Sequence, residues 1–472
     1  MARCRPCPAN RSLQQHGREA RHAANVRGAG WSVRMMPATM MRRAPFMRHL
    51  YTLAWRFLVP LALLRLIWRS RREPLYRVQL AERLGWYGRK SDAMRKGHPV
   101  LWLHAVSLGE TRAAQPLLDA LRQQHPGMQL LLTHMTATGR QAGVALLREG
   151  DVQVWLPYDL PGAMRRFLLR FRPHLGVLME TEVWPNLAQA CATLDTPLLL
   201  VNARLSARSA ARWGAWPSLA RIAFGSLTAA AAQTQSDAER LRRLGIDDVC
   251  VLGNIKFDRV SNPGLRELGL QWKLQAKRPV LLLASTREHQ GLAEEKLLLD
   301  AMPAELLQRV LLVVVPRHPQ RMDEVHALLQ AQGLNVVRRS DASPQADTQV
   351  WLGDSLGEMP AYFAMAEAAF VGGSLLPLGG QNLIEACAEG CPVVIGPHTF
   401  NFTHAVEQGV AAGAVVEAGD ASAVWSSLLA WLSDARSLER ARCAALQFSA
   451  AHRGAAEAQA GWIGQYLPVR LA

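Results

Sequence analysis

The chain has 472 residues, of which 49% are hydrophobic and 19% are charged. This length and composition exclude a disordered chain and allow two or three domains with large cores. Residues 1–100 hold 21 Lys and Arg against 4 Asp and Glu, so the net charge of +16 belongs to the N-terminal part. A basic segment of this kind favours nucleic acid or an anionic membrane surface as its partner.

The N-terminal part divides into two segments. Residues 1–45 are rich in Arg, Ala and Met with little periodicity, which predicts a disordered basic extension. Residues 46–72 are apolar and aromatic with interspersed arginines, which predicts a membrane-associated helix and decides against nucleic acid. The uninterrupted apolar run, residues 57–64, is far shorter than the ~20 residues of a spanning helix. We therefore expect a helix in the membrane interface beside anionic lipids, with a single span as the alternative.

After residue 72 the sequence alternates short apolar runs with helical patterns. The expected strands are 99–106, 129–135, 152–159, 174–181, 197–203, 227–234 and 249–255, and then 279–286, 309–316, 335–339, 350–355, 368–374, 392–397 and 412–417. Apolar strands joined by helices predict parallel sheets covered on both faces. The interruption at 258–278 resembles a linker. We therefore expect an α/β protein with two Rossmann-like domains, residues 73–265 and 266–472, facing across a cleft.

Several familiar reactions lack their motifs in this sequence. The fingerprint G-x-G-x-x-G is absent, which argues against hydride transfer with NAD, and the Walker A loop is absent, which argues against P-loop NTPase chemistry. Neither the zinc motif H-E-x-x-H nor the hydrolase motif G-x-S-x-G occurs. Because one fold hosts many functions, the reaction must be inferred from the residues at the strand ends.

In the first half, charged residues stand where strands are expected to end. Glu110 follows strand 99–106, Glu180 and Glu182 lie in "METEVWPN", and Lys256 lies in "GNIKFD". Ligands bind outside the carboxyl ends of parallel strands. Glu110 could equally be an acid favoured by a helix dipole, and Glu180 and Glu182 could cap a helix or hold Mg²⁺, although no third ligand is evident. A carboxylate opposite an activated donor suits the general base of a sugar transfer.

In the second half, two stretches suit a nucleotide. Arg317 and His318 supply positive charge and hydrogen-bond donors for a phosphate. The segment "GGQNLIEA", residues 379–386, places glycines before a helix, whose free N–H groups suit a phosphate. Glu385 could accept both hydroxyls of a ribose. Together these residues predict a nucleotide site in the second domain without an obvious metal cluster.

Taken in order, these stretches resemble the 3-deoxy-D-manno-octulosonic acid (Kdo) transferases of lipopolysaccharide synthesis. The resemblance covers roughly residues 47–465, includes an N-terminal anchor at 50–87, and rests on "HAVSLGE", "METEVWPNL", "NARLSARS", "GNIKFD", "VPRHPQR", "GDSLGEM", "FVGGSLLPLGGQNLIEA" and "GPHTFNF". Two stretches depart from the family pattern. Residues 379–383 read Gly-Gly-Gln-Asn-Leu where the family usually has Gly-Gly-His-Asn-Pro, and residues 287–291 read "REHQG" where it has a Gly-Glu run. These departures affect details of donor contacts rather than the reaction class.

The resemblance implies a GT-B fold and an inverting transfer of Kdo from CMP-Kdo to lipid IVA, a lipid A precursor, at the cytoplasmic face of the inner membrane, without a cofactor or metal. It implies Glu110 as the catalytic base, with Glu180 and Lys256 stabilising the transition state. The implied CMP-binding residues are Arg317, His318, Leu356, Gly357, Glu358, Asn382, Leu383, Ile384 and Glu385. The alternatives are a GT-B enzyme that uses another nucleotide sugar on a membrane lipid, and a nucleotide-binding regulatory protein of the membrane surface.

Overall fold

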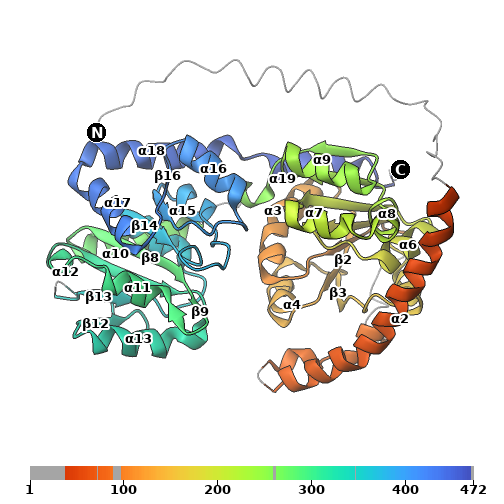
Figure 1. Cartoon of the computed structure of the whole chain (residues 1–472), viewed down its shortest axis with the longest axis horizontal. Helices are drawn as coiled ribbons and strands as arrows, with labels where there is room; N and C mark the ends of the chain where they lie inside the picture. Colours follow the sequence, from red (N-terminus) through yellow and green to blue (C-terminus); the bar gives the residue numbers. More distant parts are fainter. Residues whose placement is uncertain (1–37, 72, 89–96, 259–261, 346, 469–472) are drawn as a thin grey trace, which may run out of the picture.

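The computed structural model describes residues 38–71, 73–88, 97–258, 262–345 and 347–468. Two parallel seven-stranded sheets lie side by side in it, and helices cover the faces of each (Figure 1). All fourteen expected strands are present, because short apolar runs of this kind are stable only when both faces of a sheet are buried. The two-domain α/β architecture predicted from the sequence is therefore confirmed.

The first sheet has the strand order β3-β2-β1-β4-β5-β6-β7. Its strands are β1 Val100–His104, β2 Gln129–His134, β3 Val152–Trp155, β4 Leu175–Met179, β5 Leu198–Ala203, β6 Ala229–Ala232 and β7 Val249–Val251. Its helices are α3 Leu108–Gln124, α4 Ala137–Gly143, α5 Pro161–Phe171, α6 Pro185–Thr193, α7 Ala207–Gly214, α8 Pro217–Phe224 and α9 Gln235–Leu244, with short 3₁₀ helices η2 Pro74–Arg77, η3 Leu80–Leu84, η5 Val144–Leu146 and η6 Ile255–Asp258.

The second sheet has the strand order β12-β13-β11-β8-β14-β15-β16. Its strands are β8 Val280–Thr286, β11 Leu311–Pro316, β12 Val336–Arg338, β13 Val350–Leu352, β14 Ala368–Val371, β15 Val393–Ile395 and β16 Val415–Glu417. Its helices are α10 Pro263–Ala276, α11 Glu294–Asp300, α12 Leu306–Arg309, η7 Pro319–Arg321, α13 Met322–Ala331, α14 Met359–Met365, α15 Ile384–Ala388, α16 Thr403–Ala411, α17 Ala421–Ser433 and α18 Ala435–Ala451.

Two segments differ from the sequence-based expectation. The expected linker, 258–278, is mostly the helix α10, whose Trp272 is buried against Trp351 in the core of the second domain. A small hairpin, β9 Glu288–His289 with β10 Leu292–Ala293, was not expected at all. Its two turn residues adopt positive φ angles, as a two-residue hairpin turn requires.

The end of the chain returns to the first domain. Helix α19, Ala455–Gly464, packs against α3, and its Ala456, Ala460 and Ile463 join the core of the first sheet. Residues 455–468, which were expected to belong to the second domain, therefore lie against the first domain, and residues 469–472 lie outside the described residues. The apolar period of α19 predicts a buried face but cannot say which of two similar domains buries it.

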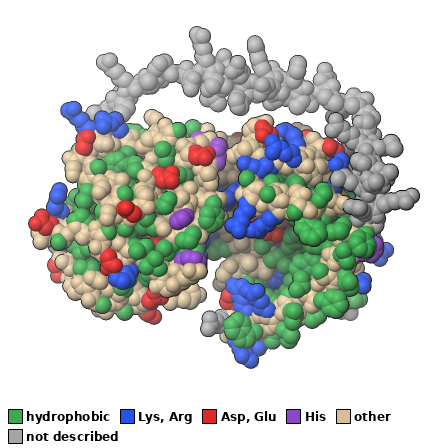
Figure 2. All heavy atoms as spheres, viewed as in Figure 1, with side chains coloured by type: hydrophobic (Ala, Val, Ile, Leu, Met, Phe, Trp, Pro, Cys, Tyr) green, Lys and Arg blue, Asp and Glu red, His purple; other side chains and the backbone are tan. Residues whose placement is uncertain are grey.

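In each sheet the chain order reverses at the strand that comes first in the sequence. In the first sheet β1 lies between β2 and β4, and in the second β8 lies between β11 and β14. Ligands of open α/β sheets bind in the crevice outside the carboxyl ends of the strands at such points. The topology therefore predicts two ligand crevices, β1/β4 and β8/β14, and Figure 2 shows the surface hollowed between the two domains.

Helix α2, Ala38–Arg69, lies along the flank of the first domain (Figure 1). Residues 1–37 of the expected extension lie outside the described residues, whereas Ala38–Pro45 are helical and belong to α2 instead. One side of α2 contacts the domain, where Thr52 exchanges hydrogen bonds with Asn186 and Trp55 stacks on Tyr158. The large exposed apolar residues of α2 are Phe46, Leu50, Leu53, Phe57, Leu58, Leu61, Leu64, Ile67 and Trp68.

The length argument against a membrane span was wrong. The helix continues through Arg56, Pro60 and Arg65, and Phe46–Arg69 is long and apolar enough to cross a membrane by length and composition. The uninterrupted run, 57–64, underestimated the helix because isolated arginines do not end it. The choice between a span and an interfacial helix therefore rests on contacts rather than on length.

Candidate functional site

Glu110 lies in the first turn of α3, directly beyond β1. Its Oε2 accepts a hydrogen bond from the Val106 N–H at 2.7 Å, and its Oε1 accepts one from Ser107 Oγ at 2.9 Å. Ser107 is the N-cap of α3 and stands three residues before Glu110, which is the spacing of a capping box. Glu110 is therefore a helix-capping acid, as the alternative interpretation of the sequence held. The same hydrogen bonds fix its carboxylate at the edge of the crevice.

The environment of Glu110 disfavours its ionised form. Burial is the main cause, and the neighbouring charges of Glu180 and Glu182 add to it, so that the pKa of Glu110 rises to about 8 despite its two hydrogen bonds. A carboxyl with a pKa near the working pH suits a general base, because it can accept a proton and release it again. The geometry and the raised pKa of Glu110 both point to proton transfer.

Glu180 and Lys256 form an ion pair at the same crevice. Lys256 Nζ lies 2.7 Å from Glu180 Oε1, and both side chains are largely buried. Glu180 follows β4 with a φ of 60°, which is uncommon for a residue other than glycine. Its backbone is fixed between Val201 O and the Arg204 N–H. Strained backbone of this kind clusters at functional sites, where surrounding contacts hold it.

The turn that carries Lys256 is held by residues that the sequence did not single out. Asn202 Oδ1 accepts the Ile255 N–H at 3.1 Å, and the Asn202 N–H donates to Gln459 Oε1 at 2.9 Å. Gln459 also donates to Gly253 O from the returning helix α19. No sequence spacing links Asn202 to Gln459, so only the fold could identify this support.

Arg317 and His318 directly follow β11 in the second domain. Burial lowers the pKa of Arg317, and the charges of Arg112 and Arg287 lower it further. The pKa of His318 is likewise lowered by burial and then by neighbouring arginines. Since Arg112 belongs to α3 of the first domain and Arg317 to the second, positive charge from both domains gathers at the cleft.

A buried carboxylate that sequence analysis missed shapes the glycine-rich loop. Glu294 accepts backbone N–H groups from Arg287 at 2.9 Å, Gly373 at 2.6 Å, and Ser374 and Leu375 at 3.0 Å. Four hydrogen bonds to one buried carboxylate fix the loop after β14 against the end of β8. The local signal that could have identified Glu294 is the pair of acids, Glu294 and Glu295, at the start of α11.

The remaining predicted nucleotide-binding residues differ in what they can offer. Leu356 is exposed, Gly357 has a φ of 90°, and Glu358 accepts a hydrogen bond from Arg339 at 3.2 Å. Leu383 and Ile384 have buried side chains, so a ligand can reach only their backbone groups.

The helix after the glycines is also shorter than expected. Helix α15 has only five residues, and Asn382 Oδ1 already accepts the Ile384 N–H at 3.1 Å. The expectation of free N–H groups for a phosphate at this helix start is therefore corrected: one of those groups is taken, and the helix is too short for a strong dipole. Glu385 lies in its first turn.

Residues of the second domain reach the edge of the first domain that holds Glu180 and Lys256. Arg204 donates a hydrogen bond to Phe400 O at 2.6 Å, and Lys256 Nζ lies 5.8 Å from the centre of the Phe402 ring. Because Arg204 also bonds to Glu180 O, the loop holding Phe400 and Phe402 is linked to the Glu180–Lys256 pair. The edges formed by the carboxyl ends of the strands in the two sheets thus face one another across the cleft.

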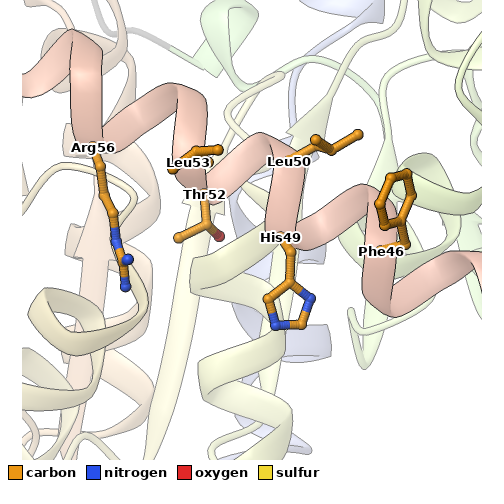
Figure 3. Close-up of a pocket in the computed structure, with 6 residues that line it drawn as sticks. All are labelled: Phe46, His49, Leu50, Thr52, Leu53 and Arg56. Carbon is orange, nitrogen blue, oxygen red and sulfur yellow. The ribbon is translucent and has the colours of Figure 1, made fainter.

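Two shallow hollows lie away from these edges. One, of about 240 Å³, is lined by residues of α2 alone, and Figure 3 shows Thr52 and Arg56 on one side of the helix with Phe46 and Leu50 on the other. The second is lined by α7 and the start of α8. A hollow lined by one helix cannot enclose a nucleotide, so we place the candidate site at the facing crevices. No group of three His, Cys, Asp or Glu suited to a metal occurs among the described residues.

Comparison with known proteins identifies the family. A family model described as 3-Deoxy-D-manno-octulosonic-acid transferase (kdotransferase) matches residues 78–259. The 3-deoxy-D-manno-octulosonic acid transferase of Bordetella pertussis is 44% identical over 434 residues, which cover 88% of this chain and 100% of that protein. This chain belongs to the Kdo transferase family. The Haemophilus influenzae enzyme of the same name is 35% identical over 89% of this chain and 99% of its own length.

Solved structures support the fold of this Kdo transferase. A UDP complex of MnaA from S. aureus aligns with 78% of this chain and 96% of its own chain, at 14% identity and a TM-score of 0.54. At this identity the likeness concerns the GT-B fold alone. Family membership confirms the resemblance inferred from the motifs and makes the protein a glycosyltransferase.

Proposed function

We propose that this Kdo transferase is an inverting enzyme that transfers Kdo from CMP-Kdo to lipid IVA at the cytoplasmic face of the inner membrane. Family membership supports the transferred sugar. The observation that carries the mechanism is Glu110, a partly buried carboxyl with its pKa raised to about 8, beside the Glu180–Lys256 pair. This crevice faces a second one rich in arginine.

In the proposed reaction Glu110 removes the proton from the attacking hydroxyl of the acceptor. The hydroxyl oxygen then forms a bond to the anomeric carbon of Kdo, from the face opposite the leaving group, so that the configuration inverts. The bond from that carbon to the phosphate oxygen breaks, and its electron pair leaves with CMP. Lys256, oriented by Glu180, stabilises negative charge that develops in this transition state.

The donor site is proposed in the second domain. Arg317 and His318 suit the phosphate of CMP, and the backbones of Leu383 and Ile384 suit the nucleoside together with Asn382 and Glu385. The exposed stretch Leu356, Gly357 and Glu358 completes the set. Because CMP-Kdo has a single phosphate, no metal ion is needed to bridge a diphosphate. Cationic side chains can stabilise the departing CMP instead.

Helix α2 supports delivery of a lipid acceptor. It contacts the first domain along one side through Thr52, Trp55 and Val59 and exposes apolar residues on the other (Figures 1 and 2). A helix with protein on one side and exposed Phe57 and Trp68 on the other suits the membrane interface. We propose that it attaches to anionic lipids, with each nearby Arg contributing about 1 kcal/mol.

A flotation assay with anionic vesicles tests this attachment. We expect high salt to release part of the full-length protein, because electrostatic attraction is screened, and apolar contacts to retain the rest. The variant with Phe57→Ser and Trp68→Ser should be released almost completely. Full salt resistance, with release by detergent alone, would instead establish a membrane span.

The proposed reaction is tested by mass spectrometry of lipid IVA incubated with CMP-Kdo and the full-length protein. We expect product lipids heavier by whole Kdo units, and CMP released in equal number. Matched reactions with UDP-sugars should leave lipid IVA unchanged. Transfer from a UDP-sugar, or no transfer from CMP-Kdo, would overturn the proposed donor.

A further inference from the structure

Arg287 lies at the reversal point of the second sheet and takes no part in the reaction proposed above. It directly follows β8, the strand between β11 and β14. Thr286 pairs with Pro316, so Arg287 and Arg317 are neighbours at the ends of adjacent strands. Neighbouring strands lie about 4.8 Å apart, so the two arginines start side by side at the edge of the crevice.

The backbone of Arg287 is held rigidly. Its N–H donates to the Glu294 carboxylate at 2.9 Å, and its carbonyl accepts the Glu294 N–H at 2.9 Å. The side chain passes over Gly373, where an added Cβ would lie 3.3 Å from Arg287 Cδ and 3.2 Å from Gln381 Nε2. Gly373 has a φ of 68°, so a glycine is needed there for both backbone and space.

The charge of Arg287 is not compensated by the protein. Among the described residues its guanidinium makes no ion pair, its buried Nε has no hydrogen-bond partner, and Arg112 and Arg317 are likewise without ion pairs. Arg321, which lies in η7 shortly after Arg317, shows the contrast, since Glu295 binds it at 2.8 and 3.1 Å. Arginines gathered without carboxylates indicate a site for anions.

We propose that Arg287 binds the carboxylate of the donor sugar, while Arg317 binds the adjoining phosphate. This inference rests on the proposed function, because a Kdo donor has a carboxylate on the carbon that bears the phosphate. Two anionic groups on one carbon match two arginines that start on adjacent strands. A donor with a neutral sugar would offer a second anion only as a second phosphate.

Steady-state kinetics with the donor can distinguish binding of the Kdo carboxylate from binding of the CMP phosphate. Arg287→Ala should raise the KM for CMP-Kdo by about 10- to 100-fold, the usual effect of losing a charge-assisted hydrogen bond, and change inhibition by CMP less than about twofold. Arg317→Ala should weaken CMP-Kdo and CMP together. Arg309→Ala is the matched control, because Arg309 is exposed at the opposite end of β11 and should alter neither.

A donor analogue without the carboxylate charge tests directly whether Arg287 recognises that group. The wild-type protein should prefer CMP-Kdo over its carboxyl methyl ester, and Arg287→Ala should lose that preference, with Arg287→Lys intermediate. Thermal unfolding should show each variant folded, since among the described residues the Arg287 guanidinium forms no ion pair that the substitution would remove. Equal weakening of CMP and CMP-Kdo, or retained discrimination against the ester in Arg287→Ala, would overturn the proposal. Failure of the wild-type protein to use CMP-Kdo would instead overturn the proposed function.

Discussion

Glu110 and Glu180 follow β1 and β4 in the first sheet, whereas Arg287 and Gly373 follow β8 and β14 in the second. The two crevices arise from the same reversal of strand order, yet one is lined by carboxylates and the other by arginines. Topology thus predicts the edge at which a ligand binds. The residues that follow each strand predict the charge of that ligand.

Burial acts on the two crevices in opposite directions. It raises the pKa of Glu110 to about 8 in the first and lowers the pKa of Arg317 and His318 in the second. Both shifts disfavour the charged forms of these side chains in the protein without substrate. In the proposed reaction, an anionic donor would offset the positive charge of the second crevice, and Glu110 in the first would take up the proton of the acceptor hydroxyl.

The largest effect is expected from removing Glu110, the proposed base of the first crevice. Glu110→Gln should lower kcat by about 10²- to 10⁴-fold, because the attacking hydroxyl then keeps its proton. The wild-type rate should rise with pH through about 8, as Glu110 ionises, and the residual rate of the variant should lack that rise. Steady-state CMP release across pH 6–9 measures both; a variant with wild-type kcat would exclude Glu110 as the base.

Removing Arg317, the proposed phosphate-binding arginine of the second crevice, should have a smaller effect. Arg317→Ala should weaken CMP binding by roughly 1.5–3 kcal/mol, the usual cost of losing a hydrogen bond to a charged group. Calorimetry with CMP measures this loss, with Arg309→Ala as control. Unchanged affinity would place the nucleotide away from β11.

The smallest effect concerns stability. The folded-state pKa of Glu110 is raised, so the folded protein holds this proton more tightly than the unfolded chain and loses stability as pH rises toward about 8. Glu110→Gln removes that loss and should raise the melting temperature by a few degrees at pH 8 but little at pH 4. Melting curves at the two pH values check it. An equal shift at both pH values would show that the charge of Glu110 is not the cause.

The sequence predicted the strands and the residues at their ends, because short apolar runs and the breaks between them are local signals. It did not predict the positive φ of Glu180, the helix α10 in place of a linker, or the return of α19 to support Lys256. Nor did it single out Glu294, three of whose four N–H partners, Gly373, Ser374 and Leu375, are distant in the chain. These features depend on contacts between segments, which no local pattern encodes.

The division of labour between the crevices is tested most directly by calorimetry with CMP on Glu110→Gln and Arg317→Ala, with turnover measured on the same samples. Glu110→Gln should bind CMP as the wild-type protein does and yet transfer almost no Kdo, whereas Arg317→Ala should bind CMP weakly. If Glu110→Gln loses CMP binding as severely as Arg317→Ala, the two crevices do not act as separate base and donor sites.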